Sequence, residues 1–201
     1  PTCEIPFGHI VREASGEEEP ALSWVDYSGF LPDGRMDGES YGVSLLNDGK
    51  YSFSMDNHVL GVTVARSPIY AHHDPAVPDP EEEYEYIDHG IQRFTIALFP
   101  HRGGWERAGT VQRALELNLP PIAVAESYHS GPLPQKGSFS AIERANVGVT
   151  ALKKAEDGGG YILRLRETAK ERGKVRVDLP LWGRTIETDM GPCEIKTFRI
   201  P

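Results

Sequence analysis

What the sequence lacks already narrows the class of protein. No stretch of the 201 residues approaches the roughly 20 consecutive apolar residues that a membrane-spanning helix needs. No compact cluster of Lys and Arg offsets the formal net charge of −9, and a negative surface repels the phosphates of nucleic acids. We therefore expect neither a membrane protein nor a nucleic-acid partner.

Cysteine is scarce, since Cys3 and Cys193 are the only two and lie near opposite ends. Two interpretations stay open. A single disulfide bond would link the two ends of the chain if both cysteines lay on neighbouring strands. We favour the other, two free and partly buried thiols in a reducing cytoplasm, because a single pair is far from a disulfide framework.

A starting methionine is also missing. The sequence begins with Pro1, and no basic stretch followed by an apolar run and a small-residue cleavage site comes after it. We expect a piece of a longer protein, for which we favour a cytoplasmic location.

Turn residues and short apolar segments are abundant. The 21 Gly and 16 Pro residues follow no fixed period, which excludes a collagen-like chain and disfavours a helical bundle. Alternating apolar residues around Asn47-Asp48-Gly49 predict a hairpin over 41–53, and further strands are predicted at 59–64 and 91–99. Spacing of three and four residues predicts one helix over 105–117. Five short strands are predicted at 146–152, 161–165, 174–179, 184–188 and 194–200.

These elements predict a mainly β fold, an antiparallel β-sandwich with one short helix. Residues 1–40, rich in turn residues and carrying the acidic run Glu17-Glu18-Glu19, are expected to form an extended lead-in. No flexible linker is evident, so 1–201 is expected to be one unit.

Catalytic motifs are weak. His72-His73-Asp74, with His89 and His101 further on, contains residue types that bind zinc, but adjacent residues of an extended chain point to opposite sides, so exposed loop histidines are favoured. No motif selects two of the 30 acidic residues as a glycosidase pair. The residues alone thus indicate an acidic β-sandwich. Whether it binds a carbohydrate stays open at this point.

A longer pattern is more specific. GVSLLNDGKY at 42–51, ARSP at 65–68 and QRFTIALFPH at 92–101 resemble the C-terminal β region of glycoside hydrolase family 38 α-mannosidases. The resemblance continues in order through 108–118, 150–156, 164–168 and 192–197, and so covers nearly the whole chain.

The resemblance implies a large β-sandwich of the kind shared with galactose mutarotase-like domains, sometimes called a supersandwich. It further implies a partner, an N-terminal catalytic domain that holds a zinc ion and the Asp nucleophile of a retaining α-mannosidase. No catalytic residue, zinc ligand or other cofactor is carried onto this chain, which is expected to be inactive alone. It would line the cleft that binds α-mannoside oligosaccharides.

The same resemblance suggests substrate-binding residues. An arginine at the end of a strand before a Ser-Pro turn points to Arg66, whose guanidinium offers a fork of donors for sugar hydroxyls. Asn47, Asp48, Lys50 and Tyr51 lie at the tip of the predicted hairpin, whose polar residues would also face the cleft. The alternatives are an ordinary surface arginine and an ordinary Asn-Asp-Gly turn, and for the whole chain a free-standing carbohydrate-binding module or a mutarotase-like epimerase.

Overall fold

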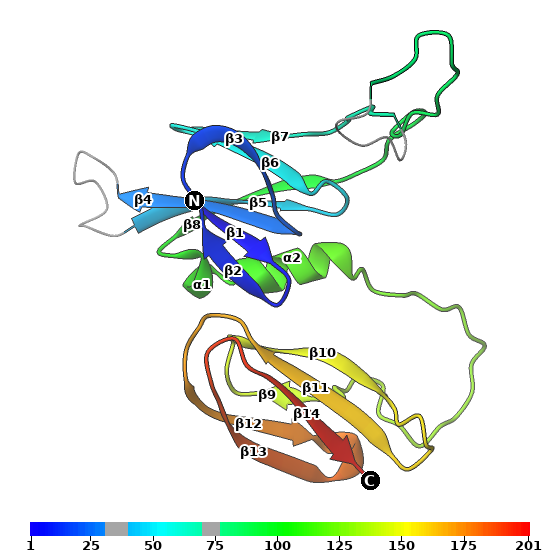
Figure 1. Cartoon of the computed structure of the whole chain (residues 1–201). Coiled ribbons are helices and arrows are strands. Elements are labelled where there is room, and N and C mark those ends of the chain that lie inside the picture. The colour runs from blue at the N-terminus through cyan, green and yellow to red at the C-terminus, as the bar shows by residue number, and fades with distance from the viewer. Residues whose placement is uncertain (31–39, 70–76) are drawn as a thin grey trace.

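The computed structural model describes residues 1–30, 40–69 and 77–201 (Figure 1). Antiparallel strands dominate, so the predicted mainly β fold is confirmed. The strands are β1 (Thr2–Ile5), β2 (Gly8–Val11), β3 (Ser15–Pro20), β4 (Trp24–Phe30), β5 (Ser40–Asn47), β6 (Ser52–Asp56), β7 (Val59–Val62), β8 (Ile96–Arg102), β9 (Ala141–Ile142), β10 (Val147–Lys154), β11 (Tyr161–Glu167), β12 (Gly173–Leu179), β13 (Arg184–Met190) and β14 (Ile195–Ile200). The helices are α1 (Trp105–Ala108), α2 (Thr110–Asn118) and a 3-10 turn at Pro180–Trp182.

The N-terminal half forms a first sandwich. A five-stranded sheet, ordered β2-β1-β4-β5-β8, packs against the three-stranded sheet β3-β6-β7. Because side chains alternate along a strand, Val25 and Leu45 point into this sandwich while their neighbours Trp24 and Leu46 point to the opposite face. Phe53 and Met55 of β6 complete the core from the second sheet.

The two helices cover the other face of the five-stranded sheet. Trp105 and Ala114 pack there with Trp24 and Leu46, and the two indole rings lie 4.7 Å apart. The predicted single helix is interrupted at Gly109, which adopts a left-handed conformation with φ 79° and so ends α1 and precedes α2.

The C-terminal part forms a second sandwich with its own core. Sheet β10-β11-β14 faces sheet β13-β12-β9, and the buried residues between them include Leu163, Leu165, Val177 and Met190. The five strands predicted for this region are all present. The chain thus folds as two sandwiches with separate cores, and not as one large sandwich as expected.

Three further expectations are corrected. Residues 1–30, the described part of the expected lead-in over 1–40, are not a lead-in, because β1 and β4 are central strands of the first sandwich. The strands on either side of Gly49 do not pair with each other, since β5 joins β4 and β8 while β6 joins β3 and β7. The strand predicted at 91–99 begins only at Ile96.

The two sandwiches touch through the hairpin β1–β2. Its turn residue Phe7, with φ 57°, lies under the guanidinium of Arg166, 5.9 Å from the ring centre. Arg166 also lies 3.8 Å from the carboxylate of Glu4, and the ammonium of Lys170 donates to the carbonyl oxygen of His9 at 3.1 Å. These contacts join β11 and the loop after it to the first sandwich.

Both cysteines are free, with Cys3 buried and Cys193 partly buried, so of the two interpretations the free thiols are confirmed. Burial raises the pKa of the Cys3 thiol. Among the described residues, no helix combines the length and the apolar character that crossing a bilayer requires.

Candidate functional site

A hollow of about 310 Å³ lies where the turn after β5 meets the segment after β7. Three of the five residues predicted to bind substrate line it: Lys50, Tyr51 and Arg66. The other lining residues are Glu18, Gly49, Ser52, Thr63, Val64, Ile87 and Asp88. Residues distant in the sequence therefore meet at one polar surface.

Asn47 lies beneath this hollow and not in it. Its side chain is fully buried, with Nδ2 donating to the carbonyl oxygen of Leu22 at 2.9 Å. Its Oδ1 accepts from the main-chain N–H groups of Gly49 at 3.0 Å and Lys50 at 2.6 Å. Asn47 thus shapes the turn, as short amide side chains commonly do, and offers no exposed atom to a ligand.

Asp48 is exposed but is not among the residues that line the hollow. Its Oδ1 accepts from the main-chain N–H of Thr95 at 2.6 Å, and its own N–H donates to the Thr95 carbonyl oxygen at 3.3 Å. The hydrogen bond from Thr95 lowers the pKa of the Asp48 carboxyl. The residue ties the turn to the chain entering β8.

Lys50 and Tyr51 present polar groups to the hollow. The Lys50 ammonium lies 5.1 Å from the centre of the Phe94 ring and donates to Gln92 Oε1 at 3.2 Å. A cation over an aromatic face is held without a carboxylate partner and keeps donors for other acceptors. Tyr51 is 55% exposed and offers both a ring face and a hydroxyl.

Arg66 lies across the hollow from this turn, just after β7. Its main-chain N–H donates to Asp88 Oδ2 at 3.1 Å, which fixes the backbone. The side chain is exposed, and no hydrogen bond or ion pair with another described residue is found for its guanidinium. With respect to the described part of the chain, the guanidinium of Arg66 therefore keeps its donors for other acceptors.

Glu18 is a lining residue that the sequence interpretation missed. Its carboxylate accepts from the Thr63 hydroxyl, and this bond, with a second from Ser52 and the charge of Arg66, lowers the pKa of Glu18. The only signal in the sequence is the acidic run 17–19. Such a run is as typical of an ordinary solvent-exposed surface as it is of a binding site. Its pairing with β6 places Glu18 at the hollow.

The hollow thus combines a guanidinium, an ammonium, a phenol and two carboxylates. Such a set can donate to and accept from the vicinal hydroxyls of a sugar. Glu18, whose pKa is lowered, does not meet the requirement of a general acid, which needs a raised pKa.

A buried polar cluster elsewhere in the first sandwich superficially resembles a catalytic triad. His101 Nε2 lies 2.7 Å from Asp26 Oδ1 and 3.2 Å from Ser44 Oγ, and Ser44 also lies 2.7 Å from Thr110 Oγ1. In a triad the acid and the nucleophile contact opposite nitrogens of the imidazole, whereas here both are at Nε2. The four side chains are buried and join the start of α2 to the sheet, a structural role.

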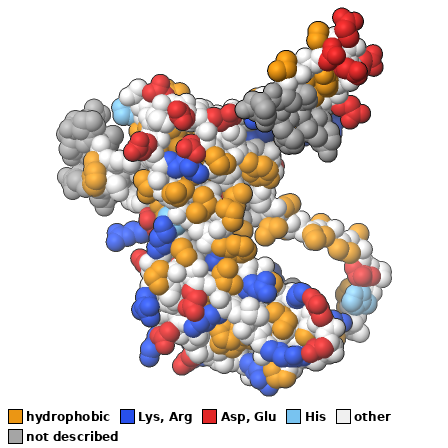
Figure 2. Space-filling view, viewed as in Figure 1, with side chains coloured by type: hydrophobic (Ala, Val, Ile, Leu, Met, Phe, Trp, Pro, Cys, Tyr) orange, Lys and Arg blue, Asp and Glu red, His pale blue; other side chains and the backbone are white. Residues whose placement is uncertain are grey.

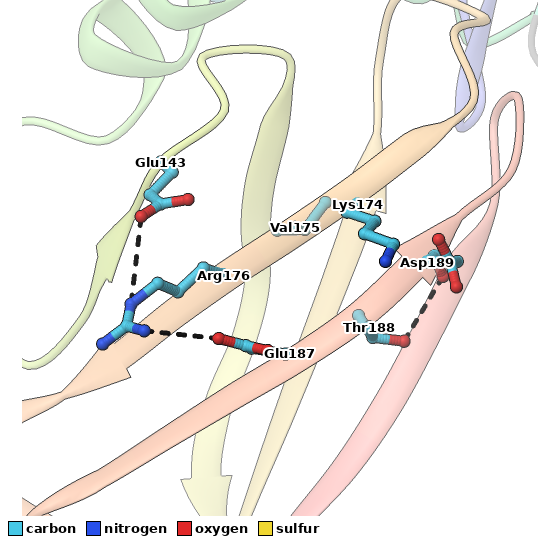
Figure 3. A pocket seen from close by; sticks show the side chains of 7 residues that line it. All are labelled: Glu143, Lys174, Val175, Arg176, Glu187, Thr188 and Asp189. Atoms are coloured by element: carbon cyan, nitrogen blue, oxygen red, sulfur yellow. Dashed lines mark hydrogen bonds and ion pairs between the residues drawn. The ribbon is translucent and has the colours of Figure 1, made fainter.

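A second hollow, of about 500 Å³, lies over β12 and β13 (Figure 3). Arg176 pairs there with Asp178 at 2.9 Å, Glu187 at 3.3 Å and Glu143 at 3.8 Å. Lys174 stands opposite Asp189 in the strand register. The residues that line this second hollow, all within the described part of the chain, include no aromatic side chain. Charge pairing along β12 and between neighbouring strands accounts for the arrangement.

Zinc does not fit the described residues. No group of three or more His, Cys, Asp and Glu side chains among residues 1–30, 40–69 and 77–201 is placed to hold a metal ion. His72, His73 and Asp74 lie outside the described residues, and His101 is engaged with Asp26.

Comparison with known families and proteins gives two matches to family models. The glycosyl hydrolases family 38 C-terminal domain matches residues 1–81, and the glycosyl hydrolases family 38 C-terminal beta sandwich domain matches residues 146–187. The first match covers β1 to β7 and the second covers β10 to part of β13.

Several curated proteins are similar. Alpha-mannosidase G of Dictyostelium discoideum is 29% identical over 179 residues, which cover 82% of this chain and 14% of that protein. Alpha-mannosidase 2C1 of Homo sapiens is 30% identical over 177 residues, covering 83% of this chain and 15% of that protein. The chain therefore spans only a small part of the relatives it matches.

A solved structure, that of an alpha-mannosidase from Enterococcus faecalis V583, superposes with a TM-score of 0.74. It covers 100% of this chain, which corresponds to 24% of that protein, at 16% sequence identity. At this sequence identity the similarity shows a shared fold alone.

Proposed function

Because this chain belongs to glycoside hydrolase family 38 as its C-terminal β region, we propose that it supplies one wall of the sugar-binding cleft of an α-mannosidase. In this proposal an upstream catalytic portion forms the opposite wall and carries the reacting groups. The substrates are α-mannoside oligosaccharides, and the protein is cytoplasmic. Zinc, with its ability to polarise or orient hydroxyl groups, belongs to the upstream portion.

The hollow lined by Lys50, Tyr51 and Arg66 carries this proposal. The guanidinium of Arg66 presents paired donors that match two neighbouring hydroxyl oxygens. The Tyr51 ring is exposed enough to pack against the apolar face of a pyranose. Glu18 and Asp88 add acceptors for the hydroxyl protons of the same sugar.

The contribution of each predicted residue differs. Arg66, Lys50 and Tyr51 are proposed to contact the sugar directly, whereas Asn47 and Asp48 act through the shape of the turn. Asn47 is a positioning residue because its amide fixes Gly49 and Lys50. Asp48 does the same toward Thr95.

The hollow gives no support to catalysis by this chain alone. Retaining and inverting glycosidases both need a protonated carboxyl group beside the leaving oxygen. Glu18, with its lowered pKa, is ionised at neutral pH and fulfils no such role. A mutarotase-like reaction would need a His and a Glu in one groove, and no histidine lines this hollow in the described part of the chain.

Two measurements test the proposal. We expect the 201-residue chain not to hydrolyse an aryl α-mannoside, with or without added zinc, while the full-length protein does so. Hydrolysis by the chain alone would contradict the division of roles. Titration calorimetry with mannose should detect no binding tighter than millimolar for the chain alone, because half of the cleft is missing. Submillimolar binding would favour a free-standing carbohydrate-binding module.

A further inference from the structure

The segment between α2 and β9, residues 119–140, contains neither helix nor strand. Its first seven residues, Leu-Pro-Pro-Ile-Ala-Val-Ala, are all apolar, and we call residues 119–125 the apolar connector. Structureless segments of this length are uncommon in compact proteins and are usually either functional or mere linkers. The composition and exposure of the connector decide between these two.

The connector holds large apolar side chains in solvent. Ile122 is 90% exposed and Val124 is 77% exposed, and Leu119 is similarly uncovered. Figure 1 shows the segment after α2 leaving the rest of the chain as a wide loop, and Figure 2 shows a run of hydrophobic side chains, in orange, along an arc on the same side. Single exposed apolar residues are normal on a protein surface, but a continuous run of them marks a contact site.

The composition does not fit a flexible linker. Solvated linkers are rich in Gly, Ser or charged residues, and the connector has none of these. Pro120 and Pro121 instead stiffen it and fix an extended backbone. Among hydrogen bonds between described residues, only the one from Leu119 N–H to the Leu115 carbonyl oxygen, at 2.8 Å, ties the connector to another element.

The connector begins next to a residue that is bonded to the end of β5. Leu119 follows Asn118, whose Nδ2 donates to the carbonyl oxygen of Asn47 at 2.9 Å. Asn47 in turn fixes the main chain of Lys50, which lines the hollow. A protein surface that binds the connector therefore also lies near the turn that carries Lys50 and Tyr51.

We propose that the apolar connector is a docking segment for the upstream catalytic portion, which seats Ile122 and Val124 in an apolar groove and so holds its reacting groups against the hollow. This inference rests on the function proposed above. The occupant follows from two observations. The matched relatives are mostly made of sequence outside this region, 85% or more of their length. The helix that precedes the connector is hydrogen-bonded to Asn47, which shapes the turn that carries Lys50 and Tyr51.

Thiol labelling tests the proposal in the protein as it exists. Val124→Cys and Tyr51→Cys are made separately in the 201-residue chain and in the full-length protein, and labelling by a maleimide is followed by mass spectrometry of the peptide. Each rate is divided by that of the same protein unfolded in urea, which removes intrinsic differences in thiol reactivity. Both side chains are well exposed here, so both should react fast in the isolated chain.

We expect labelling at both positions to be at least tenfold slower in the full-length protein. Slow labelling at 51 with unchanged labelling at 124 would overturn the docking segment and leave the proposed cleft standing. Unchanged labelling at both positions would contradict the proposed function as well. Slow labelling at 124 alone would leave contact at the connector but would contradict the placement of the reacting groups against the hollow, and the proposed function with it.

Discussion

Asn118 Nδ2 donates to the main-chain oxygen of Asn47 at 2.9 Å, so the last residue of α2 holds the last residue of β5. The same amide also donates to the Ala114 carbonyl oxygen at 2.9 Å, within the last turn of the helix. Since Asn47 shapes the turn that carries Lys50 and Tyr51, the end of the helix and the wall of the hollow form one structural unit.

Replacing Asn47 with Ala should lower the free energy of unfolding by about 1–3 kcal/mol, because buried or half-buried partners lose their hydrogen bonds. These partners are the Leu22 carbonyl oxygen and the N–H groups of Gly49 and Lys50. Urea unfolding measures the change. Asp48→Ala is the matched control, since its exposed side chain loses one bond to Thr95 and should cost less. Equal effects of the two substitutions would contradict the positioning role.

The carboxyl group of Glu18 should titrate below its usual range. The hydrogen bond from Thr63 is the main cause of its lowered pKa, so Thr63→Val should raise the Glu18 pKa toward the ordinary value. A pKa that is lower in the folded than in the unfolded chain stabilises the fold at neutral pH, and this contribution is lost as the pH falls through the folded value. NMR titration of the Glu18 carboxyl in both proteins checks the shift. If the Glu18 pKa is the same in the Thr63→Val variant and in the parent, the Thr63 hydrogen bond is not the cause of the lowered value.

Gly42→Ala should destabilise the first sandwich by about 1–3 kcal/mol through overpacking. A Cβ at position 42 would lie 2.5 Å from His101 Cε1 and would collide with the Ser28 hydroxyl, both parts of the buried cluster around Asp26. Gly29→Ala is the control on the neighbouring strand, where a Cβ meets nothing within 4 Å. Thermal unfolding should separate the two, and equal melting temperatures would contradict the packing described for His101.

The C-terminal strands were predictable because each is a short alternating segment between Gly- or Pro-containing turns. The same reasoning failed for β5 and β6. Alternation around Asn47-Asp48-Gly49 indicates two strands and a turn, but it does not tell which strand each one pairs with. Here the turn passes the chain from one sheet to the other, and the partners, β4 and β3, lie in the segment expected to be a lead-in.

The candidate site was predictable only in part. Family resemblance selected Arg66, Lys50 and Tyr51, and the fold brings them together. Asn47, by contrast, is buried and does not line the hollow. No local sequence pattern distinguishes an amide side chain that builds a turn from one that faces a ligand. Glu18 and Asp88 join the hollow through strand pairing and a bond to the Arg66 backbone, which are long-range features.

In the proposed function, this chain contributes sugar-contacting residues to an α-mannosidase. The sharpest test is Arg66→Ala in the full-length protein, with kcat/KM for an aryl α-mannoside as the readout. The control is Arg113→Ala, which replaces an exposed arginine on α2 outside the hollow. Loss of a charged hydrogen-bond donor, at about 1.5–3 kcal/mol, predicts a fall of roughly tenfold to a hundredfold for Arg66→Ala alone. If kcat/KM is the same for both variants and the parent protein, Arg66 does not contact the substrate and the claim is contradicted.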